Sequence, residues 1–114
     1  GLAQPWAGRV WMNPPYASEL IGDFSAKFAA HVANGDITEG IVLVNNATET
    51  RWFAGLAAVC KAAVFVTGRI RFLNADAFAE GAPLQGQAIL YAGHRPETFI
   101  AMFAPFGWVA RIRQ

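Results

Sequence analysis

Cysteine is nearly absent from this chain of 114 residues, which contains only Cys60. A single cysteine excludes an internal disulfide framework and suits a reducing compartment. Cys60 stands in the apolar stretch LAAVCKAAVF, so we interpret it as a small buried residue rather than a catalytic thiol. Apolar runs of the roughly 18 residues that span a membrane are also missing. No basic segment followed by an apolar one opens the chain, so we expect no signal peptide.

Charge of either sign is scarce too. Charged residues make up 15% of the chain and the net charge is +1, so the overall charge does not indicate a polyanionic partner. Among the nine cations, lysine is the rare one, with two lysines against seven arginines. Arginine makes bidentate contacts with phosphates and base edges better than lysine does. The excess of arginine therefore fits either nucleic-acid contacts or a compositional bias of the genome.

Apolar residues are abundant, at 54% of the chain, which indicates one globular domain over residues 1–114. Short apolar runs rich in β-branched residues predict strands at 8–13, 40–45, 62–68, 87–93 and 108–113. Helical spacing and end signals predict helices at 18–35, 48–60 and 95–107, with a loop at 73–86. We expect Thr48 to cap the second helix, and Pro105 to close the third one early.

This order of elements predicts an α/β fold with a largely parallel sheet and helices on both faces. Residues 108–113 alternate apolar and cationic side chains, as an edge strand does. Sheets of this kind bind ligands at the carboxyl ends of their strands. Asn13, Asn45 and Gly68 each end a predicted strand, so we expect them at that edge.

The stretch VWMNPPY, residues 10–16, ends the first predicted strand in an unusual way. Pro14 and Pro15 fix the backbone and remove two N–H donors, which leaves the carbonyls of Asn13 and Pro14 free as acceptors. Tyr16 adds a flat face with a polar tip. Two acceptors beside an aromatic plate suit an exocyclic amine on a planar ring, although a simple turn after a strand would also explain the tetrapeptide.

The chain resembles a known family in this stretch and in others that follow it in order. N-P-P-Y after a strand is the catalytic motif of S-adenosylmethionine-dependent amino-methyltransferases. Together with IVLVNNATETRWF, VFVTGRIRF and GQAILYAG, it is similar to the phage Dam-type DNA N6-adenine methyltransferases. The resemblance runs from about Pro5 to Gly93, and the NPPY segment is its most specific part.

The resemblance implies roles for the tetrapeptide. Asn13 and the Pro14 carbonyl would hold the N6 amine of adenine, and Tyr16 would stack on a base extruded from the duplex. Methyl transfer from S-adenosylmethionine would be direct and in line, and the proton would leave afterwards to water. Pro14 and Pro15 belong to the same predicted catalytic motif.

The same resemblance implies a Rossmann-like methyltransferase fold, of which this chain would be the C-terminal portion. The family's upstream segment carries part of the cofactor site, and no glycine-rich G-x-G loop occurs in this sequence. We therefore expect a homo-oligomer or a complementing chain, with double-stranded DNA as substrate. The cytoplasm of a bacterial host is the expected location, and protection of a phage genome from restriction is the implied role.

Four residues outside the tetrapeptide are candidates for DNA contact. Arg51 and Trp52 open the second predicted helix, where Trp52 could face DNA or pack in the core. Arg69 and Arg71 follow the third predicted strand at alternate positions, so they share one face and could bind phosphates together. The alternative is that this segment is a solvated strand end.

Asn13 and Asn45 are candidates for cofactor binding, and Asn46 could share this role, although turn or capping roles would also suit the last two. His31 and His94 have no companion cysteine or carboxylate cluster, so no metal is predicted.

Two alternatives to the DNA enzyme stay open. NPPY also serves enzymes that methylate an RNA base or a protein glutamine amide. A non-catalytic, methyltransferase-like subunit for binding or assembly is the alternative from a different class.

Overall fold

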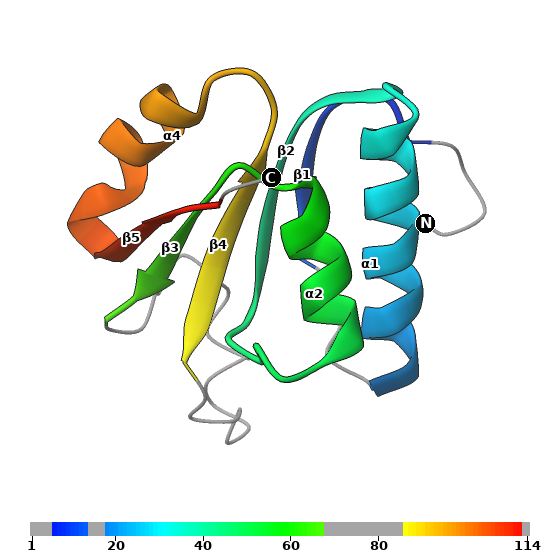
Figure 1. Cartoon of the computed structure of the whole chain (residues 1–114), viewed down its shortest axis with the longest axis horizontal. Coiled ribbons are helices and arrows are strands. Elements are labelled where there is room, and N and C mark those ends of the chain that lie inside the picture. The colour runs from blue at the N-terminus through cyan, green and yellow to red at the C-terminus, as the bar shows by residue number, and fades with distance from the viewer. Residues whose placement is uncertain (1–5, 14–17, 68–85, 113–114) are drawn as a thin grey trace.

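A computed structural model describes residues 6–13, 18–67 and 86–112 of the chain. The predicted residues Pro14, Pro15, Tyr16, Gly68, Arg69 and Arg71 and most of the predicted loop lie outside them. The strands are β1 (Gly8–Met12), β2 (Ile37–Asn45), β3 (Ala62–Val66), β4 (Gln87–Ala92) and β5 (Gly107–Arg111). The helices are α1 (Ser18–Ala33), α2 (Arg51–Val59) and α4 (Pro96–Phe103), which the 3₁₀ turn η1 (Ala104–Phe106) continues (Figure 1).

The five described strands form one sheet in the order β1-β2-β4-β3-β5. Only β1 and β2 are parallel neighbours, because β4 is antiparallel to both β2 and β3, and β5 is antiparallel to β3. The prediction of a largely parallel sheet was therefore wrong, and the sheet is mixed. The predicted α/β class and the position of β5 at an edge are confirmed.

The direction of the chain reverses once, between β3 and β4, and this explains the error. Parallel strands need a crossover connection, usually a helix, and the sequence predicts a loop rather than a helix between these two. Elsewhere the alternation holds, because α1 joins β1 to β2, α2 joins β2 to β3, and α4 joins β4 to β5, each pair running in one direction. β1, β2 and β3 therefore still end at the same edge of the sheet.

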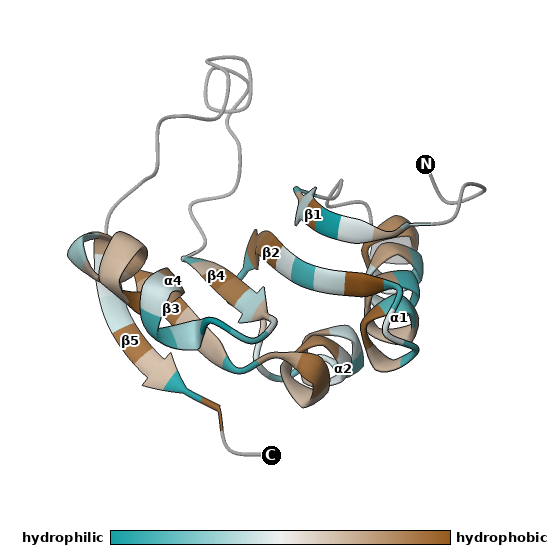
Figure 2. Ribbon diagram, turned by 90° about the horizontal axis from the view of Figure 1, so that it is seen from above, coloured by the Kyte–Doolittle hydropathy of each residue, from teal (hydrophilic) through white to brown (hydrophobic). Residues whose placement is uncertain are grey.

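Helices cover both faces of the sheet, as predicted (Figures 1 and 2). α1 and α2 lie on one face and α4 lies on the other. Crossovers are almost always right-handed. Each crossover here steps across the sheet in the same sense, but β4 and β5 run opposite to the other strands, so the same handedness brings α4 to the opposite face.

Two apolar clusters fill the layers between the sheet and its helices. The cluster under α1 and α2 includes Phe28, Val42 and Leu56, which are all fully buried. The cluster under α4 includes Leu43 of β2 and Ile89 of β4, which point to the opposite face of the sheet from Val42. None of the helices in the described part of the chain is long and apolar enough to cross a membrane.

Some element ends differ from the predicted ones. Thr50, not Thr48, caps α2, because its hydroxyl accepts a hydrogen bond from the Phe53 N–H at 3.3 Å. β2 begins three residues earlier than predicted, at Ile37. α1 ends at Ala33, and Gly35 follows it with a positive φ of 84°, as a glycine at a helix C-terminus does.

Candidate functional site

The carboxyl ends of β1, β2 and β3 meet at one edge of the sheet, which we call the carboxyl edge. Asn13 follows β1, Asn45 ends β2, and Thr67 follows β3. β4 starts at this edge, since Gln87 pairs with Asn45. Open sheets with helices on both faces place their ligands at such an edge, so this part of the predicted site geometry is present in the structure.

Backbone hydrogen bonds join the segments at the carboxyl edge. The Asn46 N–H donates to the Gly86 carbonyl at 2.9 Å, which ties the end of β2 to the start of β4. The Thr67 N–H donates to the Phe106 carbonyl at 3.0 Å, and its hydroxyl donates to the same oxygen at 3.3 Å. The turn before α2 closes where the Thr50 hydroxyl donates to the Ala47 carbonyl at 2.7 Å. Contacts between segments far apart in the sequence therefore join β2 to β4 and β3 to the start of β5, whereas the contact before α2 is local.

Both of the predicted cofactor contacts lie at this edge. Asn13 is exposed at the end of β1 and Asn45 is half-buried at the end of β2. Because Met12 lies beside Val42, Asn13 is level with Leu43, two residues before Asn45 along the neighbouring strand. The structure brings both asparagines to the carboxyl edge, and Asn45 lies two residues further along the strand direction than Asn13.

Arg51 and Trp52, both predicted to contact DNA, begin α2 at the same edge. Arg51 is exposed, and none of the described carboxylates forms an ion pair with it. Trp52 is half-buried, packs against the cluster under α1 and α2, and meets Phe53 edge to face at 5.8 Å between ring centroids. Arg51 is therefore available at the surface, whereas much of Trp52 serves the core.

A groove of about 320 Å³ lies on the α4 side of the sheet, between β1 and α4, and we call it the α4 groove. Trp11 and Ile41 lie on the strand side, and Phe99, Met102 and Phe103 on the helix side. Trp11 is 50% exposed and Met102 64% exposed, so both line an open surface. The walls are apolar except at one end, where Arg9, Glu39, Tyr91 and Arg95 gather.

Glu39 is the centre of that polar end. Its carboxylate accepts two hydrogen bonds from Arg95, both at 2.8 Å, and one from the Tyr91 hydroxyl at 2.6 Å. Arg9 forms a further ion pair at 3.2 Å. The hydrogen bonds from Arg95 and Tyr91, in that order, lower the pKa of Glu39 from 4.5 to about 2. Burial and the bond to Glu39 raise the pKa of Tyr91.

Glu39, Tyr91 and Arg95 hold the start of α4 against β2 and β4, and Arg9 adds a contact from β1. The Arg95 N–H donates to the Tyr91 hydroxyl oxygen at 2.9 Å, directly before α4 begins. They lie at the end of the sheet opposite the carboxyl edge, since Arg9 and Glu39 stand near the starts of their strands. We interpret them as a structural contact rather than as catalytic groups.

Sequence reasoning missed the Glu39 cluster and the α4 groove. The available signal was a lone carboxylate, Glu39, inside the apolar run ITEGIVLVN, because a charge buried in a strand needs partners. Its partners Tyr91 and Arg95 are 52 and 56 residues away, so no local pattern links them. Among the described residues, no group of three or more histidine, cysteine or acidic side chains is placed to hold a metal ion.

One comparison with known proteins found a similarity. The family model described as DNA N-6-adenine-methyltransferase (Dam) matches residues 1–94. Neither the search of curated proteins nor that of solved structures returned a match. The matched range contains β1 to β4 and both asparagines at the carboxyl edge, and it ends just before α4.

Proposed function

Since this chain belongs to the DNA N-6-adenine-methyltransferase (Dam) family, we propose that it takes part in methylation of the N6 amino group of adenine in DNA, with residues 13–16 holding that amine. The observation that supports the proposal most strongly is the family match over residues 1–94, which includes N-P-P-Y. The position of Asn13, exposed at the carboxyl end of β1, agrees with it.

The chain's own residues would act by holding and orienting the amine. Asn13 and the Pro14 carbonyl accept the two N–H bonds of the amine, which points the nitrogen lone pair away from them. Because Pro14 and Pro15 have no N–H donors, the carbonyls of Asn13 and Pro14 stay free as acceptors. Tyr16 stacks on the extruded adenine. Held in this way, the lone pair would be free to take up the methyl group that S-adenosylmethionine supplies, and the surplus N6 proton would pass to water.

S-adenosylmethionine is the methyl donor that the family uses, and it supplies a methyl group bound to a positively charged sulfur. The polar groups at the carboxyl edge suit the amino-acid part of this cofactor, because the amides of Asn13 and Asn45 both donate and accept hydrogen bonds. We therefore propose these two asparagines as its contacts in this chain.

We propose double-stranded DNA as the substrate, and Arg51, Trp52, Arg69 and Arg71 as its contacts. Arg51 is the member of this set whose exposure at the carboxyl edge supports the proposal directly. A homo-oligomer or complementing chain, a cytoplasmic location and a phage origin stay predictions.

A methyl-transfer assay tests the proposal. The protein is incubated with S-adenosylmethionine labelled in its methyl group and with unmethylated DNA, RNA or a protein extract in separate reactions. The variant Asn13→Ala is compared with Asn34→Ala, which removes an exposed asparagine after α1, at the other end of the sheet. We expect label in DNA adenine with the unaltered protein and with Asn34→Ala, and a loss of at least about 100-fold with Asn13→Ala, as removal of an oriented transition-state contact causes.

Each contrary result has a distinct meaning. Label in RNA or protein alone would favour the alternative substrates of the NPPY motif. Equal activity of Asn13→Ala and Asn34→Ala would refute the role of Asn13. No label in any substrate, together with no cofactor binding by calorimetry, would refute the proposal for this chain and favour a non-catalytic subunit.

A further inference from the structure

The α4 groove is an apolar surface that no described element of the protein covers. α1 and α2 cover the other face of the sheet, whereas α4 is the one described helix on this face and packs against β3 and β4 (Figure 2). The part of the face that belongs to β1 and β2 is therefore bare beside α4. Its exposed apolar walls, Trp11 and Met102, indicate a binding site.

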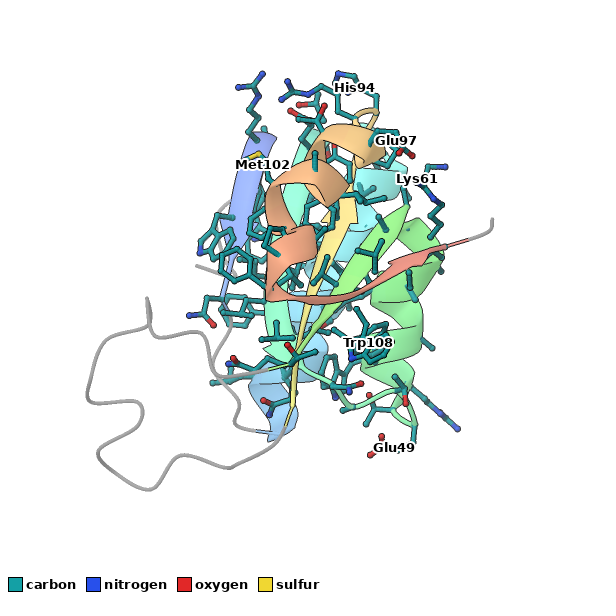
Figure 3. All side chains as sticks on the ribbon, turned by 90° about the vertical axis from the view of Figure 1, so that its left-hand side faces the viewer. Glu49, Lys61, His94, Glu97, Met102 and Trp108 are labelled. Carbon is teal, nitrogen blue, oxygen red and sulfur yellow. The ribbon has the colours of Figure 1, made fainter. Side chains whose placement is uncertain are left out.

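The size and walls of the α4 groove suit a small molecule. Its volume of about 320 Å³ lies at the lower end of the range of roughly 300–1,000 Å³ that ligand sites occupy. On the helix wall, the rings of Phe99 and Phe103 lie 5.0 Å apart between centroids. Figure 3 shows Met102 on the β1 side of α4 and Trp108 on the other side. Aromatic rings and a flexible methionine side chain adapt to a flat or chain-like apolar group.

The polar end of the α4 groove carries one positive charge in excess. Arg9 and Arg95 both pair with Glu39, so two guanidinium groups share one carboxylate. The Glu39 side chain is only 10% exposed, and its oxygens already accept hydrogen bonds from Arg95 and Tyr91. The Arg9 side chain is 78% exposed and meets Glu39 through Nε at 3.2 Å. No hydrogen bond within the described part of the chain uses the terminal nitrogens of Arg9.

This excess charge selects a ligand with a single negative charge. A carboxylate would balance it, and a guanidinium group binds a carboxylate through two parallel N–H bonds. A phosphate monoester carries about 1.5–2 negative charges at neutral pH and would leave a surplus beside Glu39. Because the walls beyond the polar end are apolar, an apolar chain or ring attached to the carboxylate fits the rest of the groove.

We propose that the α4 groove binds a small apolar carboxylate, with its charged group on Arg9 and its apolar part between Trp11 and Met102. The polar end lies at the end of the sheet opposite the carboxyl edge, so the site is separate from the proposed methyl-transfer site and does not depend on it. The helix wall of the groove follows the matched range, residues 1–94, so family membership does not account for it.

Displacement of the fluorescent dye anilinonaphthalene sulfonate tests the proposal, because this dye joins flat apolar rings to one anionic group. Octanoate should displace it, and octanol, which has the same chain without the charge, should do so at least about 5-fold more weakly. Arg9→Gln should weaken octanoate binding about 5-fold or more, since an exposed charge-assisted hydrogen bond is lost, and should leave octanol unchanged. Arg9→Lys keeps the charge and should restore part of the affinity.

Met102→Ala and Trp108→Ala form a matched pair that locates the bound octanoate. Both remove an exposed apolar side chain, but Met102 lines the groove, whereas Trp108 lies opposite Phe65 and so faces the α1 and α2 side. Met102→Ala should weaken octanoate binding about 3-fold or more, because part of an apolar wall is lost. Trp108→Ala should change it less than about 2-fold, as a surface substitution away from the site does.

Each of four results would overturn the proposal. Octanol that displaces the dye as well as octanoate would exclude recognition of the charge, and unchanged octanoate binding by Arg9→Gln would exclude Arg9. Equal losses in Met102→Ala and Trp108→Ala would place the ligand outside the groove. A lack of octanoate binding, with sedimentation showing an oligomer that Met102→Ala dissociates, would assign the groove to a second copy of the chain. Circular dichroism verifies that every variant folds, since the dye also binds partly unfolded protein.

Discussion

A methyl group added at Gly40, in the middle of β2, should destabilise the fold because Phe28 of α1 lies directly over this glycine. A Cβ atom at position 40 would lie 2.4 Å from Cζ and 2.5 Å from Cε2 of the Phe28 ring. Unstrained carbon atoms approach to about 3.5–4.0 Å. The Phe28 side chain is fully buried, so the ring has no exposed space into which it could turn.

The size of the effect follows from this overlap. Relief requires that either the ring or the strand moves by more than about 1 Å, and inserting a methyl group into a packed core typically costs about 1–3 kcal/mol. At an unfolding entropy of roughly 2.1 cal/mol/K per residue, a chain of 114 residues loses about 4 °C in Tm for each kcal/mol. Gly40→Ala should therefore lower Tm by about 4–12 °C.

Gly55→Ala is the matched control and should have the opposite sign. Gly55 is exposed within α2 and a Cβ there would meet nothing within 4 Å. Alanine in a helix interior is about 0.5–1 kcal/mol more favourable than glycine. Urea and thermal unfolding followed by circular dichroism measure both changes. Phe28→Leu in the Gly40→Ala background should cost less than Phe28→Leu alone, because the smaller side chain relieves the overlap. Equal shifts for the two glycine variants, or strict additivity with Phe28→Leu, would refute this reasoning.

Two further predictions concern titratable groups. The pKa of Glu39 falls from 4.5 to about 2 on folding, so its stabilising contribution is complete above pH 4.5 and is lost as the pH falls from 4.5 through 2. Glu39→Gln should therefore flatten the pH dependence of the unfolding free energy in this window, as measured by urea unfolding. An unchanged slope would contradict the assigned contacts. Burial raises the pKa of the Cys60 thiol to about 12, so Ellman's reagent at pH 8 should react only after unfolding, and rapid labelling of the folded protein would contradict its burial.

Local signals in the sequence predicted the strands and helices and the position of two candidate site residues at strand ends. Apolar runs and helical spacing placed the described strands and helices to within a few residues, because period and end residues act over short stretches. The same signals put Asn13 and Asn45 at the carboxyl ends of two strands, and the structure shows that these strands are parallel neighbours. The N-P-P-Y tetrapeptide can be read from sequence because its prolines restrict their own backbone wherever they occur.

The sheet order could not be predicted in the same way. β4 enters between β2 and β3 as an antiparallel strand, and its apolar run QAILYA looks the same whether its neighbours run with it or against it. The choice depends on which strands offer free edges once the earlier elements have packed. The prediction of a largely parallel sheet failed because strand composition reports burial on both faces, which a mixed sheet under helices also provides.

The sequence by itself therefore determined which segments form strands and helices and which tetrapeptide ends β1, since these depend on neighbouring residues. Only the tertiary structure decided which side chains meet. It joined Glu39 to Tyr91 and Arg95, 52 and 56 residues away, and it brought the start of β5, with Trp108, to the end of β3. Such contacts depend on strand order and direction, which arise from packing of the whole sheet rather than from any local pattern.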